Sequence, residues 1–182
     1  MTGRALPRLT RFARRFGRSQ SGAVSTEFVI AFPAVLALMA FGVELSMVTF
    51  NQSMLEQAMD VTVREIRLGT GTAPQHDDIK DRICERAHFI RDCGTNLRLE
   101  MVSFDPRDWG GIPAEPDCID TSQEVTPVRS FVNGQSNELM MLRACVRIDP
   151  LFPTSGLGKK LGEGAGGKYA LIATSAFVQE PR

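Results

Sequence analysis

The feature that most constrains this chain is an apolar run, FVIAFPAVLALMAFGV, at residues 28–43, which has no charged and no hydrogen-bonding side chain. Together with its flanks, residues 22–27 and 45–50, it exceeds the ~20 residues that span a bilayer as a helix. A buried core helix is the alternative, but a chain of 182 residues could hardly enclose this run on all sides. We therefore predict one membrane-spanning segment at residues 23–45, which includes Phe28, Pro33 and Val43. Pro33 should kink this helix, and membrane helices tolerate such a kink better than soluble ones.

Six arginines precede the first acidic residue of the chain, Glu27; they are Arg4, Arg8, Arg11, Arg14, Arg15 and Arg18. The chain as a whole has 21 basic and 21 acidic residues, so a tail of +6 precedes a body of −6. Basic residues beside an apolar span mark its cytoplasmic side. We therefore predict a basic cytoplasmic leader at residues 1–22 and an extracytoplasmic domain at residues 46–182. A nucleic-acid-binding arm and a mitochondrial presequence are the alternatives, but the apolar run that follows argues against both.

Two small residues, Gly22 and Ala23, lie on the near side of the run, whereas no A-x-A-like signal cleavage site follows it. A basic leader that ends in glycine, followed by AVSTEF at residues 23–28 and an apolar run, resembles the type IV prepilin class. The resemblance implies that a membrane aspartic peptidase cuts the chain after Gly22. Ala23 would then be the new N-terminus, Glu27 would be the fifth residue of the mature chain, and Phe28 would follow it.

More narrowly, the chain resembles the TadE-like minor pilins of the Flp (tight adherence, Tad) pilus system. The likeness is sharpest at residues 22–28 and at Gly42–Leu45, where the sequence reads GVEL. It extends loosely to the Cys…Asp-Cys segment and the strand after it, at residues 84–104. The closing FVQEP at residues 177–181 also fits, with Gln179 in place of the usual asparagine.

The resemblance implies a minor pilin or pseudopilin that takes part in assembling a Flp/Tad-type pilus and acts in adhesion or secretion. Such a protein crosses the bacterial inner membrane once, with a cytoplasmic N-terminus and a periplasmic C-terminal domain, and the surface pilus is a further destination. Its partners would be the membrane, the prepilin peptidase, other pilin-like subunits and the pilus assembly machine. The alternative is an unprocessed single-pass membrane protein whose periplasmic domain binds an envelope partner.

Two glutamates flank the apolar run. An ionised carboxylate near the hydrocarbon edge costs a few kcal/mol if it is unpaired. For Glu27, cleavage would create a compensating cation, the ammonium of Ala23, and the resemblance implies pairing with this group on a neighbouring subunit. The alternative is that Glu27 is simply solvated among the headgroups. We interpret Glu44 as a marker of the outer membrane–water boundary with no further role.

The remainder of the chain predicts an α+β fold. The long helix should continue to Leu68, because Gly69 ends its apolar pattern. Its packed face should combine two rows of residues, Met47, Met54, Ala58 and Val61 in one and Val48, Leu55, Met59 and Ile66 in the other.

A second, short helix is expected at residues 77–90, with an apolar face made by Ile79, Ile83, Ala87 and Ile90. Three strands, at residues 97–104, 138–148 and 168–178, should form a small antiparallel sheet that packs on the exposed half of the long helix.

The four cysteines, Cys84, Cys93, Cys118 and Cys145, favour two disulfides in an extracytoplasmic domain, with three possible connectivities. We prefer Cys84–Cys93 and Cys118–Cys145. The first requires the second helix to end near Ile90 and the chain to turn back, because a continuous helix would hold these Cα atoms about 13 Å apart. Zinc binding is the alternative, but no C-x-x-C spacing supports it.

The sequence offers little material for catalysis. Its only two histidines, His76 and His88, fall in a connection and on a helix surface, and the glycine-rich stretch at residues 156–167 lacks the P-loop order. We expect no enzymatic activity, no cofactor, no metal, no nucleic-acid partner and no small-molecule substrate.

Overall fold

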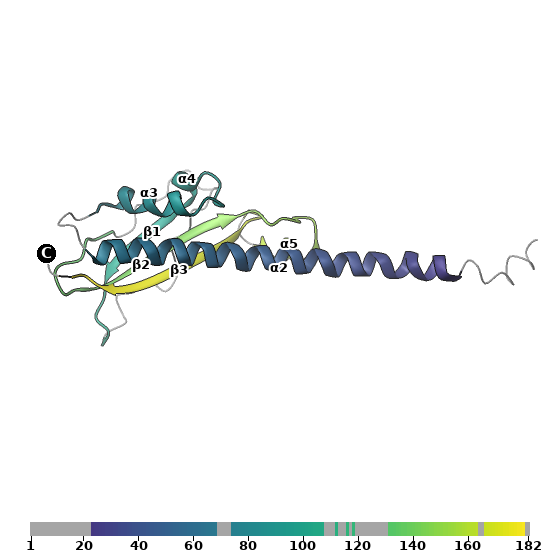
Figure 1. The fold of residues 1–182 in the computed structure, drawn as a ribbon, viewed down its shortest axis with the longest axis horizontal. Helices are drawn as coiled ribbons and strands as arrows, with labels where there is room; N and C mark the ends of the chain where they lie inside the picture. Colours follow the sequence, from purple (N-terminus) through teal and green to yellow (C-terminus); the bar gives the residue numbers. More distant parts are fainter. Residues whose placement is uncertain are drawn as a thin grey trace, which may run out of the picture. The chain divides into compact units, whose positions relative to one another are not determined.

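In the computed structural model the described residues are 23–68, 74–107, 112, 116, 118, 131–163 and 166–180. Gly22 and the predicted leader lie outside them. The chain divides into two compact units, one that ends at Val43 and one that begins at Glu44, called the head here. The elements, drawn in Figure 1, are α2 (Ala23–Arg67), α3 (His76–Arg86), α4 (Cys93–Asn96), β1 (Arg98–Ser103), β2 (Leu139–Ile148), α5 (Gly156–Leu161) and β3 (Tyr169–Val178). The predicted α+β fold is confirmed.

Helix α2 is continuous from the apolar run into the head and passes through Pro33. It ends within a residue of the predicted Leu68, and two arginines in its last turn, Arg64 and Arg67, suit the negative end of the helix dipole. In the head, its buried face is the row that contains Leu55, Met59 and Ile66, as predicted.

Part of the other predicted row on α2 is wrong. Met47 and Val61 are exposed, and Thr62 is fully buried in their place. A threonine can occupy this position because its Oγ1 donates to the carbonyl oxygen of Ala58, 2.8 Å away and one turn back. With its hydroxyl satisfied, Thr62 packs like an apolar side chain, which the apolar pattern alone does not reveal.

The three strands form one antiparallel sheet, as predicted, and their order in it is β1-β2-β3. Side chains of β3 alternate between buried and exposed, with Tyr169, Leu171, Ala173 and Phe177 facing inward. This period of two is the signature of a strand with one covered face. The central strand β2 is buried almost throughout, as in Leu142, Ala144 and Val146.

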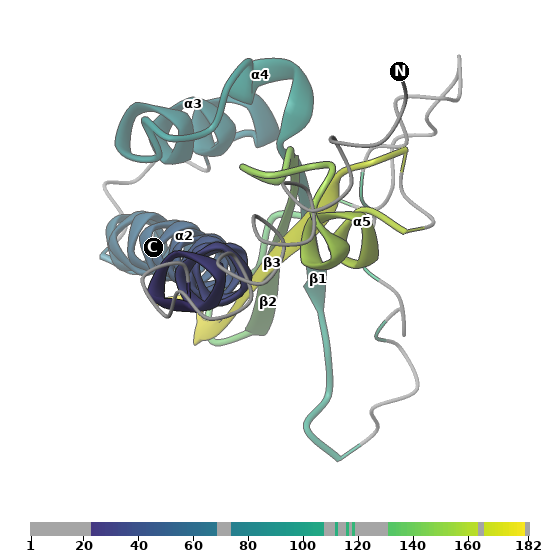
Figure 2. The same ribbon diagram turned by 90° about the vertical axis from the view of Figure 1, so that its right-hand side faces the viewer.

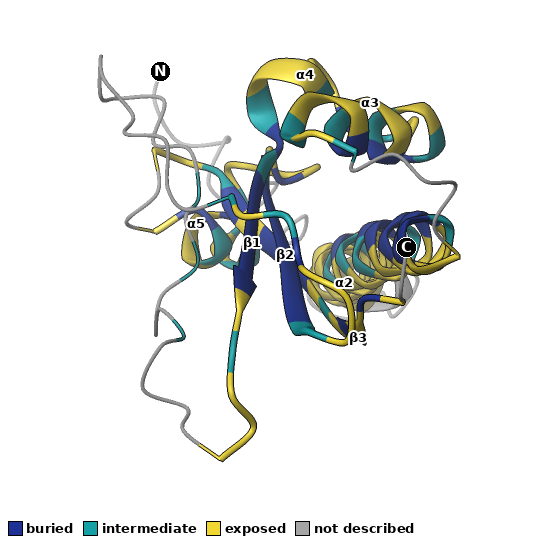
Figure 3. Ribbon diagram, turned by 90° about the vertical axis from the view of Figure 1, so that its left-hand side faces the viewer, coloured by how far each residue is buried: buried dark blue, intermediate teal, exposed yellow. Residues whose placement is uncertain are grey.

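The core lies between the sheet and helices α2 and α3, which lie on the same side of the sheet in Figure 2. Figure 3, in which the ribbon is coloured by burial, shows buried segments in the strands and in both helices. Ile79, Ile83, Ala87 and Ile90 are all buried, which confirms the predicted apolar face of the second helix.

Helix α3 ends at Arg86, four residues earlier than the predicted Ile90. The chain then turns through Asp92, whose φ of 50° is left-handed, into the short helix α4. This reversal brings the Cα atoms of Cys84 and Cys93 to 5.6 Å, and the two cysteines form a disulfide. The turn required by this bridge is therefore present, but it begins earlier than expected.

Helix α5 is an element that the sequence analysis missed, because it lies in a glycine-rich stretch. Its start is capped by Ser155, whose hydroxyl accepts a hydrogen bond from the Gly158 amide at 2.9 Å. A Cβ at Gly158 would lie only 2.1 Å from the carbonyl oxygen of Phe152, so the backbone approaches there more closely than any other residue permits. The glycine thus allows a tight connection between β2 and α5.

Candidate functional site

The part of α2 that precedes the head exposes nearly all of its apolar side chains. Ile30 and Leu38, for example, are 75% and 70% exposed, and the rings of Phe28 and Phe32 stack with their centroids 5.0 Å apart. Within the described residues, α2 is the single helix that is long and apolar enough to cross a membrane. An apolar surface of this extent, with no polar face, is stable only against lipid or another protein.

Glu27 is the last charged residue before the apolar run, and its side chain is exposed on α2. Ala23 begins the helix four residues earlier, so the two positions lie on the same face, one turn apart. Gly22, the other half of the predicted cleavage pair, lies outside the described residues. The geometry therefore places Glu27 at the N-terminal edge of the apolar surface, where its carboxylate is accessible to a partner.

Glu44, at the other end of the run, is buried and has a structural role in the head. Its side chain is 1% exposed, and its two carboxylate oxygens accept hydrogen bonds from the amides of Leu151 and Phe152 at 2.9 and 2.8 Å. These are charge-assisted bonds, which are about twice as strong as neutral ones. The interpretation of Glu44 as a boundary marker with no further role was wrong.

The Glu44 contact could not be found from the sequence, because its partners are backbone amides more than 100 residues away. Every residue except proline has such an amide, so no residue pattern marks the donors. The one available signal was a carboxylate directly after an apolar run, which requires donors if it is to be buried.

Further polar contacts join α2 to β3 inside the head. Asn51 donates through Nδ2 to the hydroxyl of Tyr169 at 3.4 Å, and Gln52 donates through Nε2 to the carbonyl oxygen of Ile172 at 2.9 Å. Burial raises the pKa of Tyr169, an effect that the hydrogen bond from Asn51 only partly offsets. These contacts fix α2 along β3.

A groove of about 670 Å³ opens beside Glu44 and Tyr169, between α2, the α3–α4 turn and the ends of β2 and β3. Its charged lining includes Arg91, Arg147 and Asp149. Across the described part of the chain, no three His, Cys, Asp or Glu side chains are grouped so that they could hold a metal ion. All four cysteines are in disulfides, so none is a zinc ligand.

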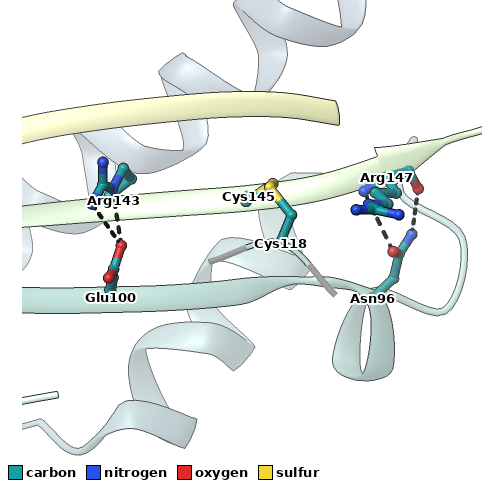
Figure 4. Close-up of a disulfide and its surroundings, with 6 residues drawn as sticks. All are labelled: Asn96, Glu100, Cys118, Arg143, Cys145 and Arg147. Carbon is teal, nitrogen blue, oxygen red and sulfur yellow. Dashed lines mark hydrogen bonds and ion pairs between the residues drawn. A yellow bond between two sulfur atoms is a disulfide. The ribbon is translucent and has the colours of Figure 1, made fainter. Parts of the chain in front are cut away.

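The second disulfide joins Cys118 to Cys145 in the centre of β2, with Cα atoms 5.2 Å apart. Both bridges thus have the connectivity that the sequence analysis preferred. Figure 4 shows this bridge between two polar contacts. On one side Asn96 donates to the carbonyl oxygen of Arg147 at 2.7 Å, and on the other Arg143 pairs with Glu100.

The Glu100–Arg143 ion pair was not anticipated. Arg143 Nε and Nη2 lie 2.9 and 2.8 Å from Glu100 Oε2, and both side chains are buried. The two residues are direct partners in the register of β1 and β2. Removing either partner would leave a buried charge uncompensated, so the pair opposes a slip of this register.

Comparison with protein families decides the relationship of the N-terminal part. Residues 22–64 match the family of TadE-like proteins. The N-terminal part of the chain therefore resembles TadE-like proteins. The match covers less than a quarter of the 182 residues, but it includes Glu27, the apolar run, Glu44 and most of the α2 surface that packs in the head. No curated protein and no solved structure matches the chain.

This match supports involvement of the protein in the Tad pilus system and its association with a membrane. The exposed apolar surface of α2 is compatible with membrane anchoring. The matched segment nearly coincides with α2: it begins one residue before the helix and ends three residues before the helix ends.

Proposed function

We propose that this protein is a minor pilin or pseudopilin that takes part in assembling a Tad-type pilus, for adhesion or secretion. The observation that carries the proposal is the exposed apolar surface of α2 within a TadE-like segment. Residues 28–43 are a membrane stem before assembly, and the same surface packs against the helices of neighbouring subunits afterwards. The N-terminus is cytoplasmic, because six arginines precede the span, and the head is periplasmic.

The mechanism begins with maturation. The prepilin peptidase cuts after Gly22, and Ala23 gains a free ammonium group next to the apolar run. The accessible carboxylate of Glu27 pairs with this ammonium on a neighbouring pilin-like subunit. Pairing removes two charges from the edge of the hydrocarbon region and sets the register between the two helices. The protein acts through assembly with the pilus machine, with no enzymatic activity of its own.

The test replaces Glu27 by alanine in cells that make the pilus, and scores both cleavage and surface piliation. Mass spectrometry should find Ala23 as the first residue of the wild-type and the variant protein, whereas piliation should fall sharply only in the variant. Glu56→Ala, at an exposed glutamate further along the same helix, is the matched control and should leave piliation unchanged. Normal piliation by the Glu27 variant would contradict the proposed pairing.

The second candidate is an unprocessed single-pass protein whose periplasmic head binds an envelope partner. The groove beside Glu44 is the observation that favours it, since it offers a concave surface with charged side chains. A mature chain that still begins at Met1 would support this candidate and would contradict maturation by the prepilin peptidase.

A further inference from the structure

The loop between β2 and α5, residues 149–155, holds two exposed apolar side chains on a tightly fixed backbone. Leu151 is 52% and Phe152 is 38% exposed. Their amides donate to Glu44, and the carbonyl oxygen of Phe152 accepts from the amide of Ser155 at 3.0 Å. Loops are usually polar and mobile, so a loop that is held rigidly while it exposes leucine and phenylalanine suggests a partner outside the head.

The position of this loop along the chain indicates the partner. Glu44 follows Val43, the last residue of the apolar run, and the amides of Leu151 and Phe152 lie within 3 Å of its carboxylate. If residues 23–45 cross a bilayer, as proposed above, Glu44 lies at the outer boundary of the hydrocarbon region. The loop must then lie at the same depth.

We propose that Leu151 and Phe152 insert into the outer surface of the bilayer, where they form a second membrane contact of the head. This inference rests on the proposed membrane stem and assigns the partner of the loop as a lipid surface. Apolar and aromatic side chains are the ones that bury at the boundary between headgroups and acyl chains. The exposed Leu45, on the first turn of α2 within the head, is on the same chain segment as Glu44 and extends the apolar contact.

The charges around the loop are compatible with this position. Asp149 pairs with Lys168 at 3.5 Å, and Lys160 of α5 pairs with Glu163 at 3.0 Å. Glu44 itself is satisfied by the two loop amides, so its carboxylate is buried at the boundary without being left unpaired. The loop tip itself, residues 150–155, has no charged side chain, so its insertion does not require a charge to enter the lipid.

The inference has a structural consequence for assembly. A head held by a single helix could turn with that helix about its axis, but a head that also inserts Leu151 and Phe152 has a restricted orientation on the membrane. Neighbouring subunits would then present the same faces to one another before the stems leave the bilayer. Glu44 is a positioning residue in this arrangement, because it holds the loop backbone and does not itself contact lipid.

The test is photo-crosslinking of the full-length protein in vesicles of phosphatidylglycerol and phosphatidylethanolamine. A photoreactive benzoylphenylalanine replaces Phe152, which keeps the backbone amide that Glu44 binds. The matched control has the same probe at Leu68, which is 64% exposed but lies about 36 Å beyond Glu44 along the helix axis. The same probe at Leu36, inside the apolar run, reports on the stem.

We expect lipid adducts at Leu36 and at Phe152, with a yield at Phe152 several-fold above that at Leu68. Strong lipid labelling at Leu36 with equal labelling at Phe152 and Leu68 would overturn the loop contact and leave the stem intact. Crosslinks from Phe152 to a second copy of the protein in place of lipid would also overturn it. An absence of lipid adducts at Leu36 would contradict the membrane stem itself.

Discussion

Helix α2 has two halves that differ in how far their apolar side chains are buried. Up to Val43 nearly all of its apolar side chains are exposed, whereas from Glu44 onward one face of the helix, which includes Leu55 and Met59, is buried in the head. The first half depends on an environment outside the chain, and the second depends on the sheet and on α3. The comparison teaches that the two halves of one continuous helix can suit different surroundings, a protein core for one and, in the proposed stem, lipid for the other.

The two glutamates at the ends of the apolar run make the same contrast at the level of single residues. Glu27 is exposed and available to a partner, whereas Glu44 is buried and fully bound by backbone amides. The same side chain thus has an intermolecular role in the proposed assembly at one end and an intramolecular role at the other. The following variants test this division.

The largest difference is expected between matched leucines in the two halves. Leu55→Ala should lower the free energy of unfolding of the head by about 2–5 kcal/mol, because Leu55 is fully buried and its removal leaves a cavity. Leu36→Ala, in the exposed half, should leave head stability within about 0.5 kcal/mol of wild type. Thermal unfolding of the full-length protein in lipid nanodiscs, followed by circular dichroism, measures both. Equal effects would contradict the division.

The two disulfides stabilise the head to different degrees. In the chain-entropy picture, the bridge that spans 27 residues, Cys118–Cys145, contributes about 3.6 kcal/mol, and Cys84–Cys93, which spans 9 residues, contributes about 2.6 kcal/mol. Serine replacement of each pair should follow this order in denaturant unfolding. Neither change should release the protein from membranes, because both bridges lie in the head.

The glutamates give a smaller but more specific effect. Glu44→Gln should destabilise the head by about 1.5–3 kcal/mol, because the amide group cannot accept from both Leu151 and Phe152. Glu27→Gln should not change head stability, because Glu27 lies outside the head. Hydrogen exchange of residues 149–155 provides the readout, and it should accelerate only in the Glu44 variant. Unchanged exchange there would show that the carboxylate does not hold the loop.

The smallest expected effect concerns pH. Burial raises the pKa of Tyr169 in the folded protein above its usual value of 10.0, so the folded state keeps the phenol protonated more readily than the unfolded chain does. The contribution of Tyr169 to the free energy of unfolding is fully present below the pKa of this residue in the unfolded chain, and it is lost as the pH rises through its pKa in the folded protein. Tyr169→Phe should remove this alkaline loss. Tyrosinate absorbance measures the titration directly, since Tyr169 is the only tyrosine.

Much of the fold could be predicted because it rests on periodic patterns. The long helix, the apolar face of α3 and all three strands follow from spacing, with ends within two residues for the strands and within one for the C-terminal end of α2. Thr62 and α5 departed from those patterns. Thr62 can be buried because its hydroxyl is satisfied within its own helix, and α5 depends on a glycine that allows a close backbone approach. Both features depend on three-dimensional geometry, which the periodic patterns do not describe.

The functional residues divide in the same way. Glu27 could be proposed from the sequence because its neighbours along the chain carry the signal, and its role in assembly stays a prediction. Glu44 was misread, and the Glu100–Arg143 pair was missed, because their partners are distant in sequence and depend on strand register and on backbone amides. Sequence patterns reveal what a residue does within its own element, whereas tertiary partners require the structure.

The central claim is that residues 28–43 are a membrane stem. Alkaline carbonate extraction of membranes that contain the full-length protein tests it most directly, because this treatment releases peripheral proteins and leaves spanning ones in the bilayer. The account predicts that the protein remains with the membrane, and that an arginine at Leu36 reduces this retention. Recovery of the intact, folded wild-type chain in the soluble fraction would contradict the account.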